Sequence, residues 1–287
     1  MMARRDILAL GGLAMAGICR PALASCEQIA IVDWALLETA LAIGITPVAA
    51  VELVLFRELA IEPFVPERVI DLGLRGSINF ELLATIRPSM IYGSNYSAWA
   101  NGTLSKIAPL RAWTIFKRGE PPYEKAVAAM RDMATSQGLQ ASAEAYIAQT
   151  ESLFADVRQR LSPKASRPLL IINLGDARHF RAFGTDSMFG DVATKLGFQN
   201  AWSRGTAYSA TAPVSLEVLA DHPEAIVVVV GPLPVEAQRV LPRSAIWQNM
   251  PAVRDDRWVT LSPVNPFGGL PAARRFARLL NEALELT

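Results

Sequence analysis

The sequence predicts an α/β protein with two α/β lobes joined by one long helix, and a ligand cleft between the lobes. Three observations support this expectation. Short apolar runs alternate with amphipathic segments in both halves, which is typical of parallel sheets covered by helices. A helical pattern of about twenty residues separates the halves. Two similar runs, 79–91 and 215–226, each predict a short helix with one glutamate, a proline and a buried strand.

The chain begins with a targeting segment. Arg4 and Arg5 precede an apolar run of thirteen residues, Ile7 to Cys19, which is too short to span a bilayer. Because a small-residue cleavage site follows at Ala22-Leu23-Ala24, we expect residues 1–24 to be a signal peptide and the mature protein to be periplasmic. The paired arginines favour twin-arginine export, although the general secretory route stays open.

Removal of residues 1–24 takes away three of the 28 basic and one of the 27 acidic residues, which leaves 25 and 26. Nucleic-acid binding through a bulk positive field is therefore disfavoured. Cys26 would be the sole cysteine, so no intramolecular disulfide is expected. Leu23-Ala24-Ser25-Cys26 resembles a lipobox, but the strand-like run that begins at Ile29 leaves no tether, and a free thiol is favoured.

The first lobe is expected at residues 27–138. Apolar runs of three to five residues predict its strands, and amphipathic patterns predict its helices. The expected strands are 29–32, 47–51, 69–72, 90–92 and 112–116, and the expected helices are 35–42, 80–86 and 123–136.

The linking helix is expected at residues 141–162. Tyr146, Thr150, Leu153 and Val157 step by four, three and four, so they form one apolar stripe on a helix about 30 Å long. A helix of this length would be a stiff spacer between the lobes, unlike a Gly/Ser linker.

The second lobe is expected at residues 167–287, where the α/β pattern restarts. Its expected strands are 169–174, 181–183, 225–230 and 258–261, and its expected helices are 187–196, 216–220 and 271–286.

The chain carries no recognisable catalytic motif. It lacks G-x-S-x-G, P-loop, G-x-G-x-x-G, H-E-x-x-H and C-x-x-C sequences. Its two histidines, His179 and His222, fit a turn and a helix end better than catalysis. A binding protein is thus favoured over an enzyme, and the alternative is an exported α/β hydrolase that pairs Ser97 or Ser209 with His179.

Candidate ligand contacts lie in loops that follow strands, where open α/β sheets bind ligands. These residues are aromatic, cationic or amide-bearing, and together they would line the cleft between the lobes: Trp34, Arg75 and Tyr96 in the first lobe, and Arg181, Trp202, Tyr208, Asn265 and Phe267 in the second.

Four runs carry a resemblance to a known family: Val32-Asp33-Trp34, Val69 to Arg75, Asp176-Ala177-Arg178-His179 and Asn200-Ala201-Trp202. In these runs, and over nearly the whole mature length, the chain resembles periplasmic ferric-hydroxamate (ferrichrome-type) siderophore-binding proteins of ABC transporters. The resemblance implies a monomeric receptor that captures a ferric siderophore and delivers it to an ABC permease for iron uptake.

The resemblance also implies roles for single residues. Arg75 and Tyr96 stand where the family has an arginine and a tyrosine that hydrogen-bond the iron-chelating oxygens. Iron enters wrapped in the siderophore, so neither a cofactor nor a metal ligand from the protein is implied. Glu81 and Glu217 match glutamates that pair with arginines on the two permease subunits.

Departures from the family concern both lobes, and in the first lobe Leu59 stands where the family has a tryptophan. Asn265 and Phe267 stand where the family has a tryptophan and a tyrosine, and Arg181 replaces an apolar contact. We therefore expect a less aromatic and more cationic pocket, and a chelate that differs from ferrichrome, for instance one with a free carboxylate. The alternative readings of the same fold are another iron chelate, haem or cobalamin.

Overall fold

The computed structural model describes residues 28–204 and 214–286. The signal peptide expected at residues 1–24 and Cys26 lie outside the described residues. The first lobe comprises β1 (Ile29–Ile31), α1 (Trp34–Ala42), β2 (Ala49–Ala50), α2 (Leu53–Leu59), β3 (Ile70–Asp71), α3 (Phe80–Ile86), β4 (Met90–Ser94), a 3₁₀ helix (Asn95–Ala100), α4 (Asn101–Ile107), β5 (Leu110–Trp113) and α5 (Tyr123–Gln137).

The second lobe follows α6 (Gln140–Leu161), which is the expected long helix. It comprises β6 (Leu169–Leu174), β7 (His179–Ala182), α7 (Met188–Lys195), β8 (Val214–Ser215), a 3₁₀ helix (Leu216–Asp221), β9 (Ile226–Val230), α8 (Val235–Val240), α9 (Ala245–Asn249), α10 (Pro251–Arg254), β10 (Trp258–Leu261) and α11 (Leu270–Glu285).

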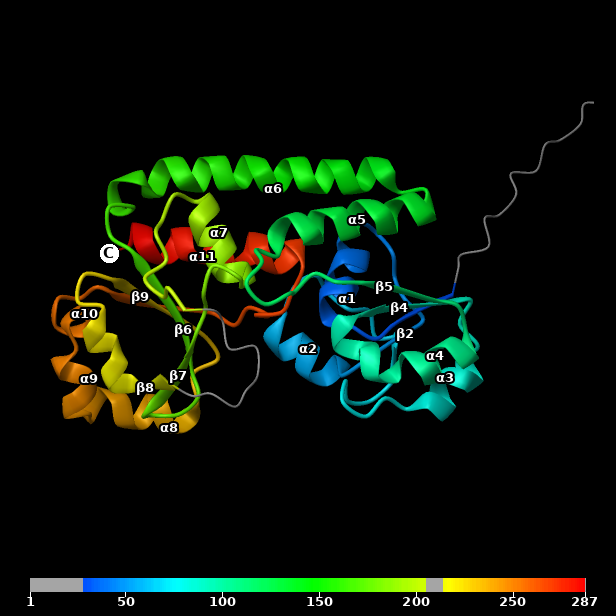
Figure 1. The fold of residues 1–287 in the computed structure, drawn as a ribbon, viewed down its shortest axis with the longest axis horizontal. Coiled ribbons are helices and arrows are strands. Elements are labelled where there is room, and N and C mark those ends of the chain that lie inside the picture. The colour runs from blue at the N-terminus through cyan, green and yellow to red at the C-terminus, as the bar shows by residue number, and fades with distance from the viewer. Residues whose placement is uncertain (1–27, 205–213, 287) are drawn as a thin grey trace, which may run out of the picture.

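Each half of the chain builds its own five-stranded sheet, and the two sheets lie side by side in Figure 1. The first sheet is parallel throughout, in the order β3-β2-β1-β4-β5. The second has the order β10-β9-β6-β7-β8 and is mixed, because β7 runs antiparallel to both of its neighbours. Parallel pairing at β7 was impossible, since only residues 175–178 separate it from β6 and a parallel crossover needs a dozen residues or so.

Local sequence explains where the helices of the first lobe begin and end. Asp33 caps α1 by accepting a hydrogen bond from the Leu36 N–H at 3.0 Å, and Asn79 caps α3 in the same way. Gly138 ends α5 at φ +68°, a left-handed conformation that glycine adopts without steric cost. The short helix expected at 216–220 is a 3₁₀ helix instead.

The linking helix α6 extends across both lobes and is packed along its length, on α5 and on α11 (Figure 1). The expected stripe is confirmed at Thr150 and Val157, which are buried with Ile147, Phe154 and Leu161. The buried apolar residues of α6 belong to the same apolar cluster as those of α5 and α11, so the helix packs against both lobes.

The apolar core is continuous between the lobes. One cluster of buried side chains runs from β1 through α1, α5, α6, α11 and α7 to β6, β9 and β10. A second cluster covers the other face of the second sheet. Along β6 the side chains alternate between them: Leu169 and Ile171 face the shared core, whereas Leu170 and Ile172 face the second cluster. The lobes are therefore separate as sheets but joined as one core.

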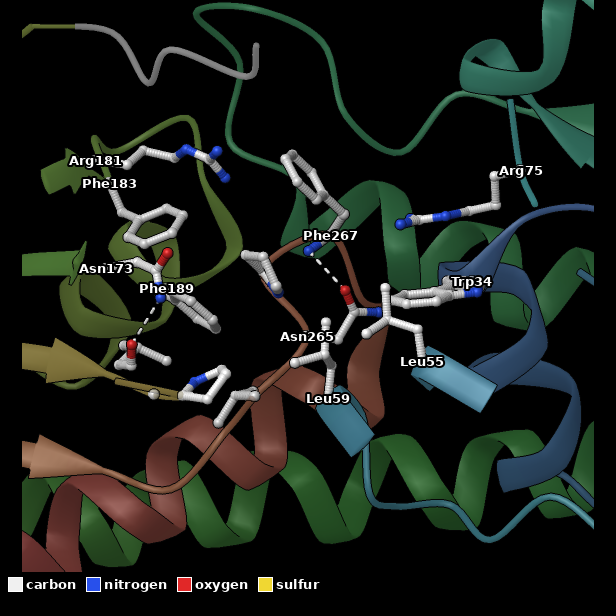
Figure 2. Close-up of a pocket in the computed structure, with 15 residues that line it drawn as sticks. Trp34, Leu55, Leu59, Arg75, Asn173, Arg181, Phe183, Phe189, Asn265 and Phe267 are labelled. Carbon is white, nitrogen blue, oxygen red and sulfur yellow. Dashed lines mark hydrogen bonds between the residues drawn. The ribbon is translucent and has the colours of Figure 1, made fainter. Parts of the chain in front are cut away.

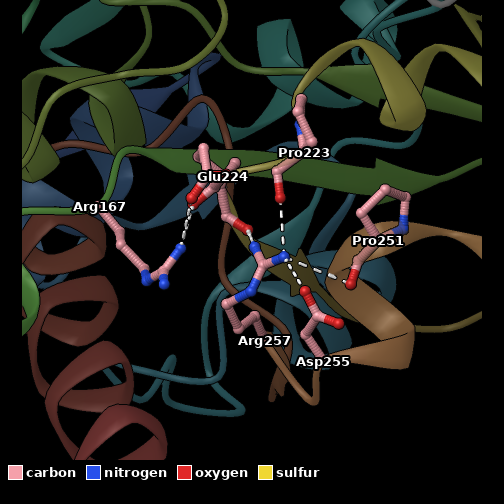
Figure 3. A network of polar contacts seen from close by, with 7 residues as sticks. Arg167, Pro223, Glu224, Pro251, Asp255 and Arg257 are labelled. Carbon is pink, nitrogen blue, oxygen red and sulfur yellow. Dashed lines mark hydrogen bonds and ion pairs between the residues drawn. The ribbon is translucent and has the colours of Figure 1, made fainter.

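A polar network fastens the strand starts of the second sheet (Figure 3). The Arg257 guanidinium donates to the carbonyl oxygens of Pro223 and Ala225, at 2.7 and 2.8 Å, and to the Asp255 carboxylate at 2.6 Å. Since Ala225 precedes β9 and Arg257 precedes β10, this network holds the edge of the sheet opposite to the carboxyl ends of the strands.

Within residues 28–204 and 214–286, none of the helices combines the length and the apolar character that a membrane crossing requires.

Candidate ligand-binding cleft

A cavity of about 420 Å³ lies between the lobes (Figure 2). A second cavity, of about 380 Å³, adjoins it over the first lobe and shares Trp34, Arg75 and Phe267 with it. Both volumes fall within the range of small-molecule sites. The first is lined by Trp34, Leu55, Leu59, Arg75, Asn173, Arg181, Phe183, Phe189, Val230, Gly231, Pro232, Val264, Asn265, Pro266 and Phe267. The second adds Val32, Asp33, Glu52, Gly76, Tyr96, Ser97 and Trp99.

The cleft is built at the carboxyl ends of parallel strands, as the sequence predicted. In the first lobe Trp34, Glu52, Arg75 and Tyr96 follow β1, β2, β3 and β4 respectively. In the second lobe Gly231 follows β9 directly and the segment 264–267 follows β10. Residues far apart in the sequence are thereby brought to one crevice.

Arg75 is held on two sides. Its Nε donates to Glu52 Oε2 at 2.5 Å, and its guanidinium carbon lies 3.7 Å from the centroid of the Trp34 ring. The ring itself is fixed, because Trp34 Nε1 donates to the Val51 carbonyl oxygen at 3.1 Å. Figure 2 shows the Arg75 side chain pointing from the first lobe into the cavity. The remaining guanidinium N–H groups can serve a ligand.

Glu52 is a residue of this site that the sequence analysis missed. Its backbone adopts the left-handed conformation (φ 53°) between β2 and α2, and its side chain is only 15% exposed. The Asp71 carboxylate ties this turn to the Arg75 loop by accepting from the N–H groups of Leu53 and Gly73, at 3.0 and 2.9 Å. Its place in the sequence could have indicated Glu52 as a site residue, because it directly follows the strand expected at 47–51.

Tyr96 faces the same crevice from the turn after β4. Ser94 caps this turn by accepting from the Tyr96 N–H at 3.1 Å. Tyr96 is 44% exposed, and the centroid of its ring lies 5.8 Å from that of Phe267, which belongs to the second lobe. Partial burial and the charges of Asp33 and Asp186 raise the Tyr96 pKa to about 12. The phenol therefore keeps its proton and can donate a hydrogen bond.

Asp33 is a buried acidic side chain that lines the cavity of the first lobe. It accepts from the Ser94 hydroxyl at 2.5 Å as well as from the α1 backbone. Burial raises the pKa of Asp33, which favours its neutral form relative to an exposed aspartate.

Asn265 connects the second lobe to α1 of the first lobe through a buried hydrogen bond. It is 1% exposed; its Nδ2 donates to Glu38 Oε1 at 2.7 Å, and its Oδ1 accepts from the Phe267 N–H at 3.1 Å. The Gly269 N–H donates to the second Glu38 oxygen at 2.9 Å. A Cβ at Gly269 would lie 2.7 Å from Thr39 Oγ1, so glycine permits this close approach to α1. Both polar atoms of Asn265 thus have protein partners, and the residue positions Phe267.

The second lobe contributes one cation to the cleft. Arg181 lies on β7 opposite Asn173 on β6, and both line the cavity. Asn173 Nδ2 donates to the Val230 carbonyl oxygen at 2.9 Å, which fixes the amide (Figure 2).

One other expected contact, Trp202, lines neither of the two cavities. Trp202 is 7% exposed and packs in the second core cluster, with ring centroids 6.3 Å from Phe180 and 6.2 Å from His222. Its placement in the cleft wall is therefore wrong: the indole fills the apolar face of the second sheet that points away from the shared core. Tyr208 lies outside the described residues, as does Ser209.

The two glutamates singled out for docking are exposed on different lobes. Glu81 is in the first turn of α3, and Glu217 follows β8, where the Ser215 hydroxyl donates to its carboxylate. Both α3 and β8 lie on the side of the molecule opposite α6 (Figure 1).

Of the hydrolase alternative, the described residues test only the pair Ser97 and His179, which lie in different lobes and line different pockets. His179 Nδ1 lies 3.0 Å from Asp176 Oδ2 and lines a surface groove of the second lobe. Ser97 Oγ instead donates to the Ser94 carbonyl oxygen at 3.0 Å and lines the cavity of the first lobe. Across the described part of the chain, no three His, Cys, Asp or Glu side chains are grouped so that they could hold a metal ion.

Comparison with known proteins places this geometry in context. The family described as periplasmic binding protein matches residues 29–264. The iron(3+)-hydroxamate-binding protein FhuD of Escherichia coli (strain K12) is 32% identical over 259 residues, which are 90% of this chain and 87% of that protein.

Two solved structures share the fold. The siderophore-binding protein FhuD from Vibrio cholerae, with Fe3+-Desferal bound, matches with a TM-score of 0.85 and 24% identity over 91% of this chain and 98% of that chain. The triscatecholate siderophore-binding protein FeuA from Bacillus subtilis, complexed with ferri-bacillibactin, matches with a TM-score of 0.71 and 17% identity, over 91% of this chain and 93% of that chain.

Proposed function

This chain belongs to the periplasmic binding protein family, and from that premise we propose that it captures ferric hydroxamate-type siderophores in the periplasm and delivers them to an ABC permease of the inner membrane. The curated relative with 32% identity is an iron(3+)-hydroxamate-binding protein, and the similar protein from Vibrio cholerae was solved with Fe3+-Desferal bound. Solute binding, and no catalytic step, is the activity of this family.

The observation that carries the proposal is the arrangement of Arg75 and Tyr96. Both donors face one crevice, within a wall that also presents Trp34 and Phe267. A ferric trihydroxamate offers six partly negative oxygens on a compact face. A guanidinium can donate to more than one of them, and the protonated phenol adds a directional donor while its ring contacts the ligand backbone.

Iron would stay enclosed by the siderophore, so the protein need supply only hydrogen bonds and apolar contact. A site that holds the siderophore without binding iron itself fits this cleft, whose lining is mostly apolar and whose polar groups are few. We further propose that Glu81 and Glu217 dock to the permease, that residues 1–24 direct export, and that Cys26 remains a free thiol.

The charge of the cleft favours hydroxamates over catecholates. A ferric tris-catecholate carries a charge of about −3, and its recognition needs several cations without counter-charges. In this cleft Arg75 is already paired with Glu52, which leaves Arg181 as the remaining cation among the described lining residues.

The test is a titration of tryptophan fluorescence with ferric and iron-free hydroxamates, and with a ferric tris-catecholate. Since the Trp34 ring lines both cavities, saturable quenching by a ferric hydroxamate is expected. Folded protein that shows no saturable response to any ferric hydroxamate would contradict the proposal. Tighter binding of the catecholate would assign the cleft to that class instead.

A further inference from the structure

The two arginines of the cleft are in different electrostatic states. Arg75 and Arg181 come from opposite lobes, and Figure 2 shows their side chains extending toward one another, with Phe267 between them. Arg75 forms an ion pair with Glu52 at 2.5 Å, so the first lobe presents a guanidinium whose charge is largely compensated.

Arg181 has no such counter-charge. Within the ranges 28–204 and 214–286, its side chain forms no ion pair and no hydrogen bond, whereas Arg75, Arg167 and Arg275 each pair with a carboxylate. The β6–β7 register fixes its direction, because Arg181 lies opposite Asn173 and both side chains reach the cavity. The cation is thus built into the cleft wall and is half-buried.

The surroundings of Arg181 make an unpaired charge unfavourable. Phe183 and Phe189 line the cavity beside it, and both are fully buried. Withdrawing a cation from water next to apolar rings costs free energy unless an anion compensates it. The acidic groups around the cleft already have partners. Glu52 pairs with Arg75, Asp33 accepts from Ser94 and the α1 backbone, and Asp186 accepts from the Gly119 N–H. Glu38 accepts from Asn265 and Gly269.

We propose that the cleft selects a ferric hydroxamate that carries one additional anionic group, such as a free carboxylate, and that Arg181 binds this group while Arg75 and Tyr96 bind the iron-chelating face. A ferric trihydroxamate centre is itself neutral, so the anion must be a substituent of the ligand backbone. One uncompensated arginine matches one negative charge. This inference rests on the proposed function and names its ligand class more narrowly.

The test compares ferric chelates that share one scaffold and differ only in net charge. Three linear ferric trihydroxamates are compared, which differ only at one terminus: an ammonium group (net +1), an acetylated amine (net 0) and a succinylated amine (net −1). The succinylated chelate is expected to bind about tenfold more tightly than the acetylated one in low salt, and the ammonium form most weakly. The preference should shrink as ionic strength rises, because the cleft is open to solvent.

Substitutions at Arg181 assign the preference to this residue. Arg181→Gln is expected to equalise the affinities for the succinylated and acetylated chelates, and Arg181→Lys to retain their order. Arg178→Gln is the matched control, since Arg178 is an exposed arginine of the same lobe that lines a separate groove. Arg178→Gln should leave the order and the ratios of the three affinities unchanged.

The outcomes separate the two proposals. If all three ferric hydroxamates bind equally, or if the preference survives in Arg181→Gln, the inference about Arg181 is overturned and the proposed function stands. If none of the three binds to folded protein, the proposed function falls, and the inference with it.

Discussion

The guanidinium carbon of Arg75 lies 3.7 Å from the centroid of the Trp34 ring. This stacking joins two residues that follow different strands of the first sheet, and it leaves the guanidinium edge directed at the cleft. Because the indole is itself hydrogen-bonded to the Val51 carbonyl oxygen, the cation is oriented before a ligand arrives. Preorganisation of this kind reduces the entropy lost on binding.

Replacement of Arg75 tests the main anchor. Arg75→Ala should weaken the binding of ferric hydroxamates by about 1.5–3 kcal/mol, the range for a lost hydrogen bond to a charged group. Arg75→Lys keeps the charge but loses the planar fork and the full stacking, so it should recover only part of the affinity. Fluorescence titration measures both. An unchanged affinity in Arg75→Ala would remove this residue from the site.

Glu52 should act by positioning Arg75. In Glu52→Gln the guanidinium loses its charged partner but keeps the indole, so binding of the neutral acetylated chelate should weaken by about 1 kcal/mol. The cleft should also gain positive character, so the preference for the succinylated chelate over the acetylated one should increase. A purely structural role would alter stability and leave that preference unchanged.

Glu38 should make stability fall as the pH rises. Burial raises its pKa from 4.5 to about 8 in the folded protein. Between these values the native state holds a proton that the unfolded state releases, so the free energy of unfolding decreases with rising pH, by up to roughly 1.4 kcal/mol per pH unit. The contribution is complete below pH 4.5 and lost by about pH 8.

Urea unfolding at pH 5 and pH 8 measures this dependence. Glu38→Gln cannot titrate, so its stability should vary less with pH than that of the unaltered protein. Its amide group would face the N–H donors of Asn265 or Gly269, so it should be the less stable protein at pH 5. Equal pH dependence in the two proteins would refute the role assigned to Glu38.

Arg257 should contribute to the stability of the protein but not to ligand binding. Arg257→Gln would leave the carbonyl oxygens of Pro223 and Ala225 without their donor and should lower the free energy of unfolding by about 1–3 kcal/mol. Because the network lies at the strand starts, siderophore affinity should be unchanged. Thermal melting and fluorescence titration of the same sample check both statements, and a parallel loss of affinity would contradict the second.

Glu81 and Glu217 should affect delivery without affecting capture. Glu81→Gln and Glu217→Gln are each expected to reduce uptake of an iron-labelled hydroxamate in cells that carry the cognate permease, and the double variant should reduce it further. The control is Glu285→Gln, whose carboxylate lies 3.7 Å from Arg160 at the α6 side of the molecule. Normal uptake by the double variant would exclude these glutamates from docking.

Much of the site followed from the position of residues after strands. Arg75 and Tyr96 were predicted from this rule, and the structure brings them to one crevice with Phe267. Glu52 obeys the same rule but was missed, because a lone glutamate before the apolar run of α2 gives no sign that its backbone turns left-handed and its carboxylate turns back to Arg75.

Other features depended on tertiary packing that no local pattern encodes. Trp202 comes two residues after Asn200, which bridges to Leu169 of β6, and its indole packs in the second core cluster with Phe180. The helix α2 was not predicted, because Leu53-Val54-Leu55-Phe56 is a uniformly apolar run that does not show the period of a helix. The antiparallel pairing of β7 was open to prediction, because a connection as short as residues 175–178 permits no parallel crossover.

The continuous core beneath α6 has a consequence for how this molecule could be divided. A chain cut between α5 and α6 would yield two fragments that each expose the apolar surface now shared through α11 and α7. Neither fragment would be a self-sufficient module, and complementation of the two in solution should be required to restore a soluble receptor. The halves resemble each other in sequence pattern, but their shared core predicts that they unfold as one cooperative unit.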